Sequence, residues 1–141
     1  MKVLYSTTVD AIGGRNGAIR SADGVLDFKL AIPPELGGKG GATNPEQLFA
    51  AGYAACFGNA VIHISRNQQR KIKDDDVDVA ATVGLTPNGA GGFALTVALA
   101  VTLAGVDQPT AEAIVAEAHK ICPYSNATRG NIDVALTVRT R

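Results

Sequence analysis

Two cysteines are the residues of this chain best suited to covalent or redox chemistry. Cys56 lies inside a long apolar stretch, and Cys122 lies at the end of a second one, followed by Pro123-Tyr124-Ser125. They are the only cysteines in the chain of 141 residues. Two thiols can form a structural disulfide, bind a metal ion, or act as a reactive pair. The class of the protein depends on which of these three roles the cysteines have.

Length and composition narrow the choice. A chain of 141 residues that is 46% apolar and 18% charged has the size of one domain, residues 1–141, and can bury a core without disulfides. The formal net charge of zero and the absence of basic clusters interleaved with aromatics argue against a nucleic-acid partner. With no secretory signal and no uninterrupted apolar run of about 18–20 residues, we expect a cytoplasmic protein without membrane insertion, whose thiols stay reduced.

The pattern of apolar and turn residues predicts strands and two helices. Strands are expected over residues 3–9, 25–32, 77–83, 93–103 and 132–138, with turns at residues 13–17 and 87–92. The first helix is expected to start at Asn44-Pro45-Glu46-Gln47 and to run to about residue 70. The second is expected from residues 107–109 to Cys122, with Ile121 and Cys122 on its buried face and Pro123 ending it. This order indicates an α+β domain.

The first predicted helix has no polar face. Residues 48–64 are apolar or small almost all round. Such a helix is buried on all sides, and a domain of 141 residues struggles to cover one completely. We therefore expect a second subunit to help cover it.

Two other uses of the cysteines fit the spacing poorly. His119 and Cys122 have the spacing of metal ligands, and Cys56 and His63 would complete a set of four. However, Cys56 and His63 are two helical turns apart, about 10 Å along the axis, which is too far for one zinc ion. The same distance removes His63 as the base of a Cys-His hydrolase, and His119 is expected at the surface.

A redox motif and an inert pair are further alternatives. Cys122-Pro123-Tyr124-Ser125 is similar to a monothiol glutaredoxin motif, but that motif precedes a helix, whereas here it follows one and residues 126–131 are not expected to be helical. The simplest alternative is two buried cysteines that only pack in the core and have no chemical role. Against it stand Arg15 in a glycine-rich turn and Glu46 in the first turn of the Cys56 helix. Glu46 lies about 15 Å from Cys56, too far to touch the thiol, but it could hold an arginine that does. The residues alone leave both interpretations open.

Five segments resemble a known family. They include Gly13-Gly14-Arg15, residues 23–26 and 36–38, the stretch 44–57 around Cys56, and the stretch 122–131 that begins at Cys122. Together they resemble the organic hydroperoxide resistance proteins, which form a superfamily with the osmotically inducible protein C group. The resemblance covers essentially the whole chain, in order.

The resemblance implies a fold and a set of site residues. The fold would be α+β, an intertwined homodimer with two long central helices wrapped by antiparallel β-sheets and active sites at the dimer interface. Cys56 matches the peroxidatic cysteine and Cys122 the resolving cysteine. Arg15 matches the arginine that activates the thiolate, and Glu46 the carboxylate that orients that arginine.

The resemblance also implies a reaction. A thiol-dependent peroxidase would reduce organic and fatty-acid hydroperoxides to alcohols through a sulfenic acid and an intramolecular disulfide. The reductant would be an external dithiol, dihydrolipoamide or a lipoylated protein, with no bound cofactor or metal. The alternatives are an osmotically inducible protein C-type peroxidase with the same chemistry and a different reductant, or a peroxide- or acyl-binding module without turnover.

The chain departs from the family pattern at a few positions. Asn16 follows the turn arginine, where an acidic residue is common in the family. Gly58 stands where many members have a bulkier apolar residue, Asn59 follows it, and His63 adds a polar group to the helix. We expect these changes to affect the pocket, the substrate preference and the motion of the Arg15 turn rather than the mechanism.

Overall fold

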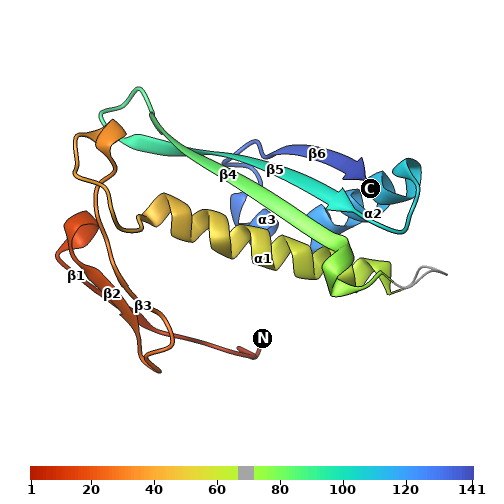
Figure 1. Ribbon diagram of the computed structural model, residues 1–141, viewed down its shortest axis with the longest axis horizontal. Coiled ribbons are helices and arrows are strands. Elements are labelled where there is room, and N and C mark those ends of the chain that lie inside the picture. Colours follow the sequence, from red (N-terminus) through yellow and green to blue (C-terminus); the bar gives the residue numbers. More distant parts are fainter. Residues whose placement is uncertain (67–71) are drawn as a thin grey trace. The chain divides into compact units, whose positions relative to one another are not determined.

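The structure is a computed structural model that describes residues 1–66 and 72–141 (Figure 1). The described residues form three α-helices and two three-stranded sheets, so the predicted α+β class is confirmed. The chain divides into two compact units, residues 1–48 and residues 49–141. The single domain over residues 1–141 stays a prediction.

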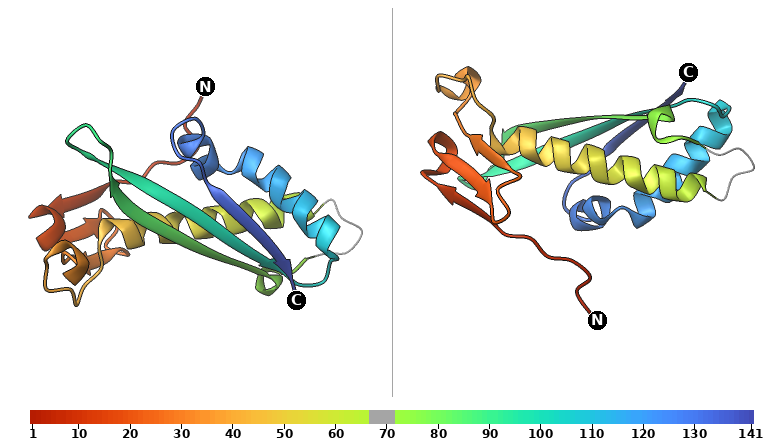
Figure 2. Two further views of the ribbon diagram at one scale, coloured as in Figure 1. Left: turned by 90° about the horizontal axis from the view of Figure 1, so that it is seen from above. Right: turned by 60° about the horizontal axis from the view of Figure 1, so that its bottom comes forward.

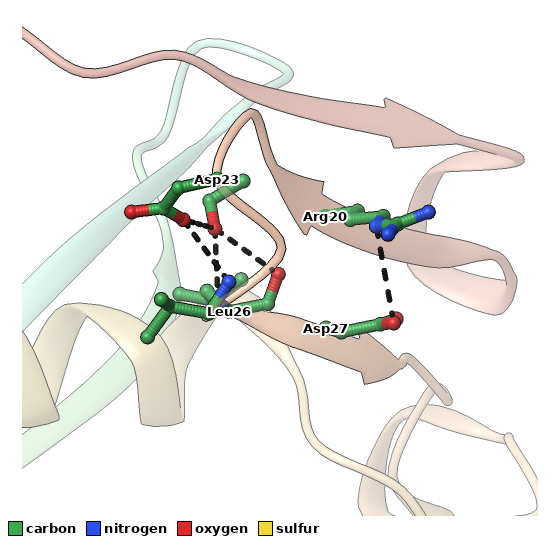
Figure 3. Close-up of polar contacts among 6 residues, drawn as sticks. Arg20, Asp23, Leu26 and Asp27 are labelled. Atoms are coloured by element: carbon green, nitrogen blue, oxygen red, sulfur yellow. Dashed lines mark hydrogen bonds and ion pairs between the residues drawn. The ribbon is translucent and has the colours of Figure 1, made fainter.

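The first unit is built on a small antiparallel sheet. Strand β1 (Val9–Ile12) pairs with β2 (Ala18–Ser21), and β2 pairs with β3 (Asp27–Lys29). Figure 3 shows how the turn between β2 and β3 closes: the Ser21 hydroxyl donates to Asp23 (2.5 Å) and accepts from the Leu26 N–H (2.9 Å). The hydrogen bond from Ser21 lowers the pKa of Asp23, so this carboxylate stays charged at the turn.

The strand predicted over residues 3–9 is wrong. Strand β1 begins only at Val9, and Val3, Leu4 and Tyr5 are exposed. A strand needs a neighbour to pair its backbone N–H and C=O groups, and β2 reaches back only as far as Val9 in this unit. Beyond β1, the Thr8 carbonyl accepts one hydrogen bond from the Ala22 N–H (3.0 Å).

Helix α1 (Pro45–Ser65) starts as predicted and ends earlier. The Asn44 side chain accepts a hydrogen bond from the Gln47 N–H (2.9 Å), and Pro45 occupies the first helical position. This is the N-cap arrangement that the sequence indicated. The predicted end near residue 70 is wrong, because the helix ends at Ser65, whose hydroxyl donates to the Ile62 carbonyl (2.8 Å); residue 70 itself lies outside the described residues.

The sheet of the second unit is mixed. Strands β4 (Val77–Pro87) and β5 (Phe93–Leu103) pair antiparallel, as the predicted hairpin requires. Strand β6 (Ala135–Thr140) pairs with β5 in parallel, so the expectation of purely antiparallel sheets is wrong. The reason is the connection: parallel neighbours need a crossover, and here helices α2 (Gln108–Ile121) and α3 (Pro123–Thr128) supply it.

The core of this unit lies between the sheet and the helices. Figures 1 and 2 show α2, α3 and the part of α1 from Phe49 onward on one face of the β4–β5–β6 sheet. Alternate residues of β5 are buried against them, namely Val97, Leu99, Val101 and Leu103. The buried face of α2 is the predicted one, consisting of Ala111, Ile114, Val115 and Ala118, except that Ile121 is exposed. The core thus fixes the positions of α1 and α2 against this face of the sheet.

Helix α1 is apolar but poorly covered within one chain. It is long and apolar enough to cross a membrane by length and composition, with a mean hydropathy of 1.4 over its 18-residue window, although the sequence shows no uninterrupted apolar run of that length. The core helix of a soluble protein passes the same test. Only 28% of that window is buried in one chain.

Candidate active site

The structure brings the two cysteines together. The Sγ atoms of Cys56 and Cys122 lie 3.8 Å apart, and both side chains are free thiols. Cys122 is fully buried, whereas Cys56, in the middle of α1, is half-buried. A disulfide requires an Sγ–Sγ distance of about 2.05 Å. The two thiols are therefore in contact without being bonded, and a small movement would allow a bond.

Cys122 occupies the corner between two helices. Its N–H donates to the Ala118 carbonyl (2.9 Å) at the end of α2, and its carbonyl accepts from the Asn126 N–H (2.9 Å) in α3. The expectation that residues 126–131 are not helical is therefore wrong as far as Thr128. Pro123 cannot continue α2, but its fixed φ suits the first position of a new helix. One of the two arguments against the glutaredoxin-like alternative, the absence of a helix after Cys122, is therefore removed. The other argument, that a helix also precedes Cys122, stands.

The environment within this unit favours the protonated form of the Cys56 thiol. Burial raises the pKa of the Cys56 thiol above its usual value, and the neighbouring Cys122 adds to the rise. A backbone hydrogen bond from the Tyr124 N–H lowers this pKa and offsets part of the effect. Because the thiolate is the nucleophile, reaction near neutral pH requires a further group, such as a cation, that favours the charged form.

Arg15 and Glu46 form a bidentate ion pair within the first unit. The Nη1 of Arg15 donates to Oε2 of Glu46 (2.9 Å), and Nη2 donates to Oε1 (2.7 Å). This hydrogen bonding is the first cause of the raised pKa of Arg15 and of the lowered pKa of Glu46. Two parallel hydrogen bonds fix the plane of the guanidinium as well as its position. The structure therefore brings together the two charged residues that the sequence singled out.

Glycines shape the turn that carries Arg15. Arg15 lies in a short 3₁₀ turn, Gly14–Asn16, preceded by Gly13 at a left-handed φ of 83°. A Cβ on Gly17 would lie 1.6 Å from the Ile12 carbonyl oxygen, so only glycine fits this close approach. Asn16, one of the departures from the family pattern, accepts a hydrogen bond from the Ile32 N–H (3.4 Å) and so ties the turn to the segment after β3.

The two histidines differ in surroundings. His63 is exposed on α1, which differs from the expectation that the helix is buried on all sides over residues 48–64. His119, expected at the surface, is half-buried: its Nδ1 lies 2.8 Å from the Ser125 Oγ, and its ring packs 6.3 Å from that of Phe57. Across residues 1–66 and 72–141, no group of three or more His, Cys, Asp or Glu residues is placed to hold a metal ion.

Sequence reasoning missed His119, Ser125 and Tyr53 as a connected group. The Tyr53 hydroxyl lies 2.8 Å from the Ser125 Oγ, which also bonds to His119. The available signal was the motif after Cys122, which contains Ser125. The partners of Ser125 come from two other helices, so the sequence could not name them.

An apolar cavity of about 740 Å³ lies in the second unit. Its walls come from α1, α3 and the β4–β5 hairpin, and its apolar side chains include Phe49, Phe93, Leu95, Pro123, Tyr124 and Ile132. Tyr124 also directs its N–H at Cys56, so one residue links the cavity to the thiol. The Tyr124 ring fits against α1 because position 52 is glycine: a Cβ there would lie 2.5 Å from the Tyr124 hydroxyl oxygen.

The fold and the paired thiols define an α+β protein with a candidate dithiol site. The family profile described as OsmC-like protein matches residues 38–137. The organic hydroperoxide resistance protein of Xanthomonas axonopodis pv. citri is 48% identical over 139 residues, which are 97% of this chain and 96% of the relative. The chain belongs to the OsmC-like family and, within it, to the organic hydroperoxide resistance proteins, as the sequence predicted.

Solved structures agree with this assignment. The crystal structure of an organic hydroperoxide resistance protein from Legionella pneumophila has a TM-score of 0.93 and 53% identity, covering 98% of this chain and 99% of that one. A structure from Vibrio cholerae, described with captopril bound in one of the active sites of a putative organic hydroperoxide resistance protein, has a TM-score of 0.90 and 50% identity, covering 99% of this chain and 94% of that one.

Proposed function

We propose that this protein is a cysteine-based peroxidase that reduces organic hydroperoxides to alcohols. The observation that carries the proposal is the 3.8 Å contact between the Cys56 and Cys122 Sγ atoms in a chain whose relatives are named for resistance to organic hydroperoxides. In a structural disulfide the two sulfurs would be bonded. A chain of this size does not need a disulfide to fold, so contact between two cysteines without a chemical role is not expected.

The reaction has three balanced steps. The Cys56 thiolate attacks one peroxide oxygen, the O–O bond breaks, and the alkoxide leaves as an alcohol after taking up a proton; Cys56 becomes a sulfenic acid. The Cys122 thiol then attacks the Cys56 sulfur, the S–S bond forms, and water leaves with the thiol proton. An external dithiol finally donates two electrons and two protons, which restores both thiols and leaves the dithiol as its own disulfide.

Arg15 is the activating residue in this mechanism, and Glu46 orients it. The second unit raises the pKa of Cys56, so a cation must favour its thiolate. A guanidinium beside the sulfur would do this and would also polarise the peroxide oxygen. The bidentate contact with Glu46 supports the orienting role, because it holds the guanidinium in one plane.

The cavity supports an organic substrate. Alkyl burial contributes about 0.8 kcal/mol per methylene, so an apolar cavity of about 740 Å³ would favour alkyl and fatty-acid hydroperoxides over hydrogen peroxide. The departures Gly58, Asn59 and His63 are not among the described residues that line it. Gly58 and Asn59 instead line a separate shallow groove between α1 and β4. These departures therefore leave the wall of the cavity unchanged.

The working form is proposed to be a homodimer with two central α1 helices. In one chain, Ala51 and Ala55 of α1 are exposed, and the adjoining groove is lined by small or apolar side chains such as Ala54, Ile62 and Val79. A helix that is apolar all round is normally covered, and a second copy of α1 has matching small side chains. We expect sedimentation equilibrium at micromolar concentration to give twice the 14.5 kDa of one chain. A monomer at the same concentration would contradict the dimer.

A comparison of reductants tests the proposed function. With cumene hydroperoxide as substrate, we expect steady turnover with dihydrolipoamide, slower turnover with dithiothreitol and little with thioredoxin, because the proposed reductant is a lipoyl-type dithiol in the cytoplasm and no bound cofactor takes part. Hydrogen peroxide is the control substrate and is expected to react more slowly. Preference for another reductant would favour the osmotically inducible protein C-type alternative. Binding of the peroxide without consumption would favour the non-catalytic module and overturn the proposal.

A further inference from the structure

A chain of buried polar side chains crosses the apolar layer beside the two cysteines. The Tyr53 hydroxyl lies 2.8 Å from the Ser125 Oγ, and the Ser125 Oγ lies 2.8 Å from the His119 Nδ1. Tyr53 and Ser125 are both fully buried. Peroxide chemistry as proposed above uses none of the three. A buried polar group without a partner destabilises the folded state, so the three groups depend on one another.

The direction of these hydrogen bonds follows from the state of His119. Burial, and then the charge of Arg129, lower the pKa of His119 and favour its neutral form. In the tautomer protonated at Nε2, the neutral ring accepts at Nδ1, and the single proton of the Ser125 hydroxyl then donates to His119. The Ser125 oxygen is then free to accept from the Tyr53 hydroxyl. All three groups are satisfied in this arrangement.

Each member of the network lies one helical turn from a cysteine. His119 is three residues before Cys122 in α2, Ser125 is three residues after Cys122 in α3, and Tyr53 is three residues before Cys56 in α1. The network therefore ties both helices that flank Cys122 to the helix that carries Cys56. The Thr128 hydroxyl, buried at the end of α3, lies 3.4 Å from the Tyr53 hydroxyl and adds a second, longer polar contact between α1 and α3.

We propose that Tyr53, Ser125 and His119 are positioning residues that hold Cys122 opposite Cys56. Their hydrogen bonds fix the corner between α2 and α3, and the corner sets the distance of the Cys122 sulfur from α1. Disulfide formation is the step that depends on this distance, because Cys122 must reach the Cys56 sulfenic sulfur as water leaves. This inference rests on the proposed function for its kinetic part, whereas the equilibrium between dithiol and disulfide can be measured without any peroxide.

Arg129 reinforces the same corner from the surface. Its guanidinium donates to the His119 carbonyl and to the Asn126 side chain, each at 2.5 Å, and its N–H donates to the Ser125 carbonyl (3.0 Å). The residue thus bridges the last turn of α2 and the end of α3. The motif that follows Cys122 in the sequence consequently has a structural meaning: Ser125 and Arg129 hold the helix corner that carries the thiol.

The test separates positioning of the thiol from general stability. Ser125→Ala and His119→Leu each remove a hydrogen-bonding group from the network. His119→Asn restores an acceptor close to the Nδ1 position. Glu117→Gln, which changes an exposed ion pair on α2, is the matched control. In stopped-flow with cumene hydroperoxide, we expect sulfenic acid formation at Cys56 to stay within about twofold of wild type. Disulfide formation should slow about tenfold in the two removing variants, which is near the upper end of the range that loss of one hydrogen bond gives.

The equilibrium provides a second readout that needs no peroxide. In dithiothreitol redox buffers, the constant for disulfide formation should fall about tenfold in Ser125→Ala and His119→Leu, or about 30 mV. It should return toward the wild-type value in His119→Asn and stay unchanged in Glu117→Gln. His119 is only half-buried, so its variants decide the question if Ser125→Ala does not fold.

Each result has a distinct meaning. Unchanged disulfide kinetics and unchanged equilibrium in folded His119→Leu would overturn the positioning role while leaving the peroxidase intact. Equal slowing of both chemical steps, without rescue by His119→Asn, would also overturn it, since it would show a purely structural role. If the wild type consumes no peroxide while the variants show the expected equilibrium shifts, the proposed function is overturned and the positioning role stands.

Discussion

Cys56→Ser is expected to lower the consumption of cumene hydroperoxide to the rate of the uncatalysed reaction. A hydroxyl is not ionised near pH 7 and is a far weaker nucleophile toward a peroxide oxygen than a thiolate. The substitution is nearly isosteric and Cys56 is only half-buried, so the protein should fold. The measurement is the initial rate of peroxide loss with dihydrolipoamide in excess, with circular dichroism to check the fold.

Cys122→Ser is the matched variant, and a different result is expected from it. Cys56 can still attack the peroxide, so one equivalent of alcohol should form per subunit. No intramolecular disulfide can follow, and the protein should stall as a sulfenic acid that excess peroxide oxidises further. Mass spectrometry after one turnover should show one added oxygen on the peptide containing Cys56. Steady turnover in Cys56→Ser equal to wild type would end the hypothesis for both residues.

Arg15→Ala is expected to slow the first oxidation of Cys56 by about 10–1,000-fold at pH 7. An opposite charge beside an ionisable group shifts its pKa by about 1–3 units, and each unit changes the thiolate fraction about tenfold when little thiolate is present. Because burial raises the pKa of the Cys56 thiol, removing the cation should leave mostly thiol. The single-turnover rate in stopped-flow measures this step directly.

The pH dependence distinguishes activation from misfolding. If Arg15 acts on the thiol, the rate of Arg15→Ala should rise with pH and approach that of wild type where the thiol ionises without help. A variant damaged in its fold would stay slow at every pH. Arg15→Lys is the control for charge: it keeps the cation but loses the bidentate contact with Glu46. A wild-type single-turnover rate in Arg15→Ala at pH 7 would show that Arg15 is not the activator.

The ion pair between Arg15 and Glu46 makes a contribution to stability that depends on pH. Arg15 holds the pKa of Glu46 below its usual value, so the pair contributes its full stabilisation above about pH 4.3, the ordinary pKa of glutamate. The contribution is lost as the pH falls through the lowered pKa of Glu46. Glu46 therefore stays charged in the neutral range, and its protonation changes neither the activity nor the stability of the wild type there.

The parts of the fold that depend on local pattern could be predicted. The Asn44 cap, the start of α2 near residues 107–109 and the hairpin before Phe93 each rest on residues close together in the chain, and local rules describe such features well. The pairing of the strands was harder to predict from the sequence. The parallel position of β6 and the unpaired residues before Val9 depend on which neighbours the folded chain offers.

The site divides in the same way. The sequence by itself determined the family, the residue types that can do redox chemistry, and the break that Pro123 imposes at Cys122, because these depend on composition and short motifs. Only the tertiary structure decided that the Cys56 and Cys122 sulfurs face one another at 3.8 Å and that Ser125 joins His119 to Tyr53. These contacts join residues from separate helices, and the packing of those helices against one sheet sets the distances between them.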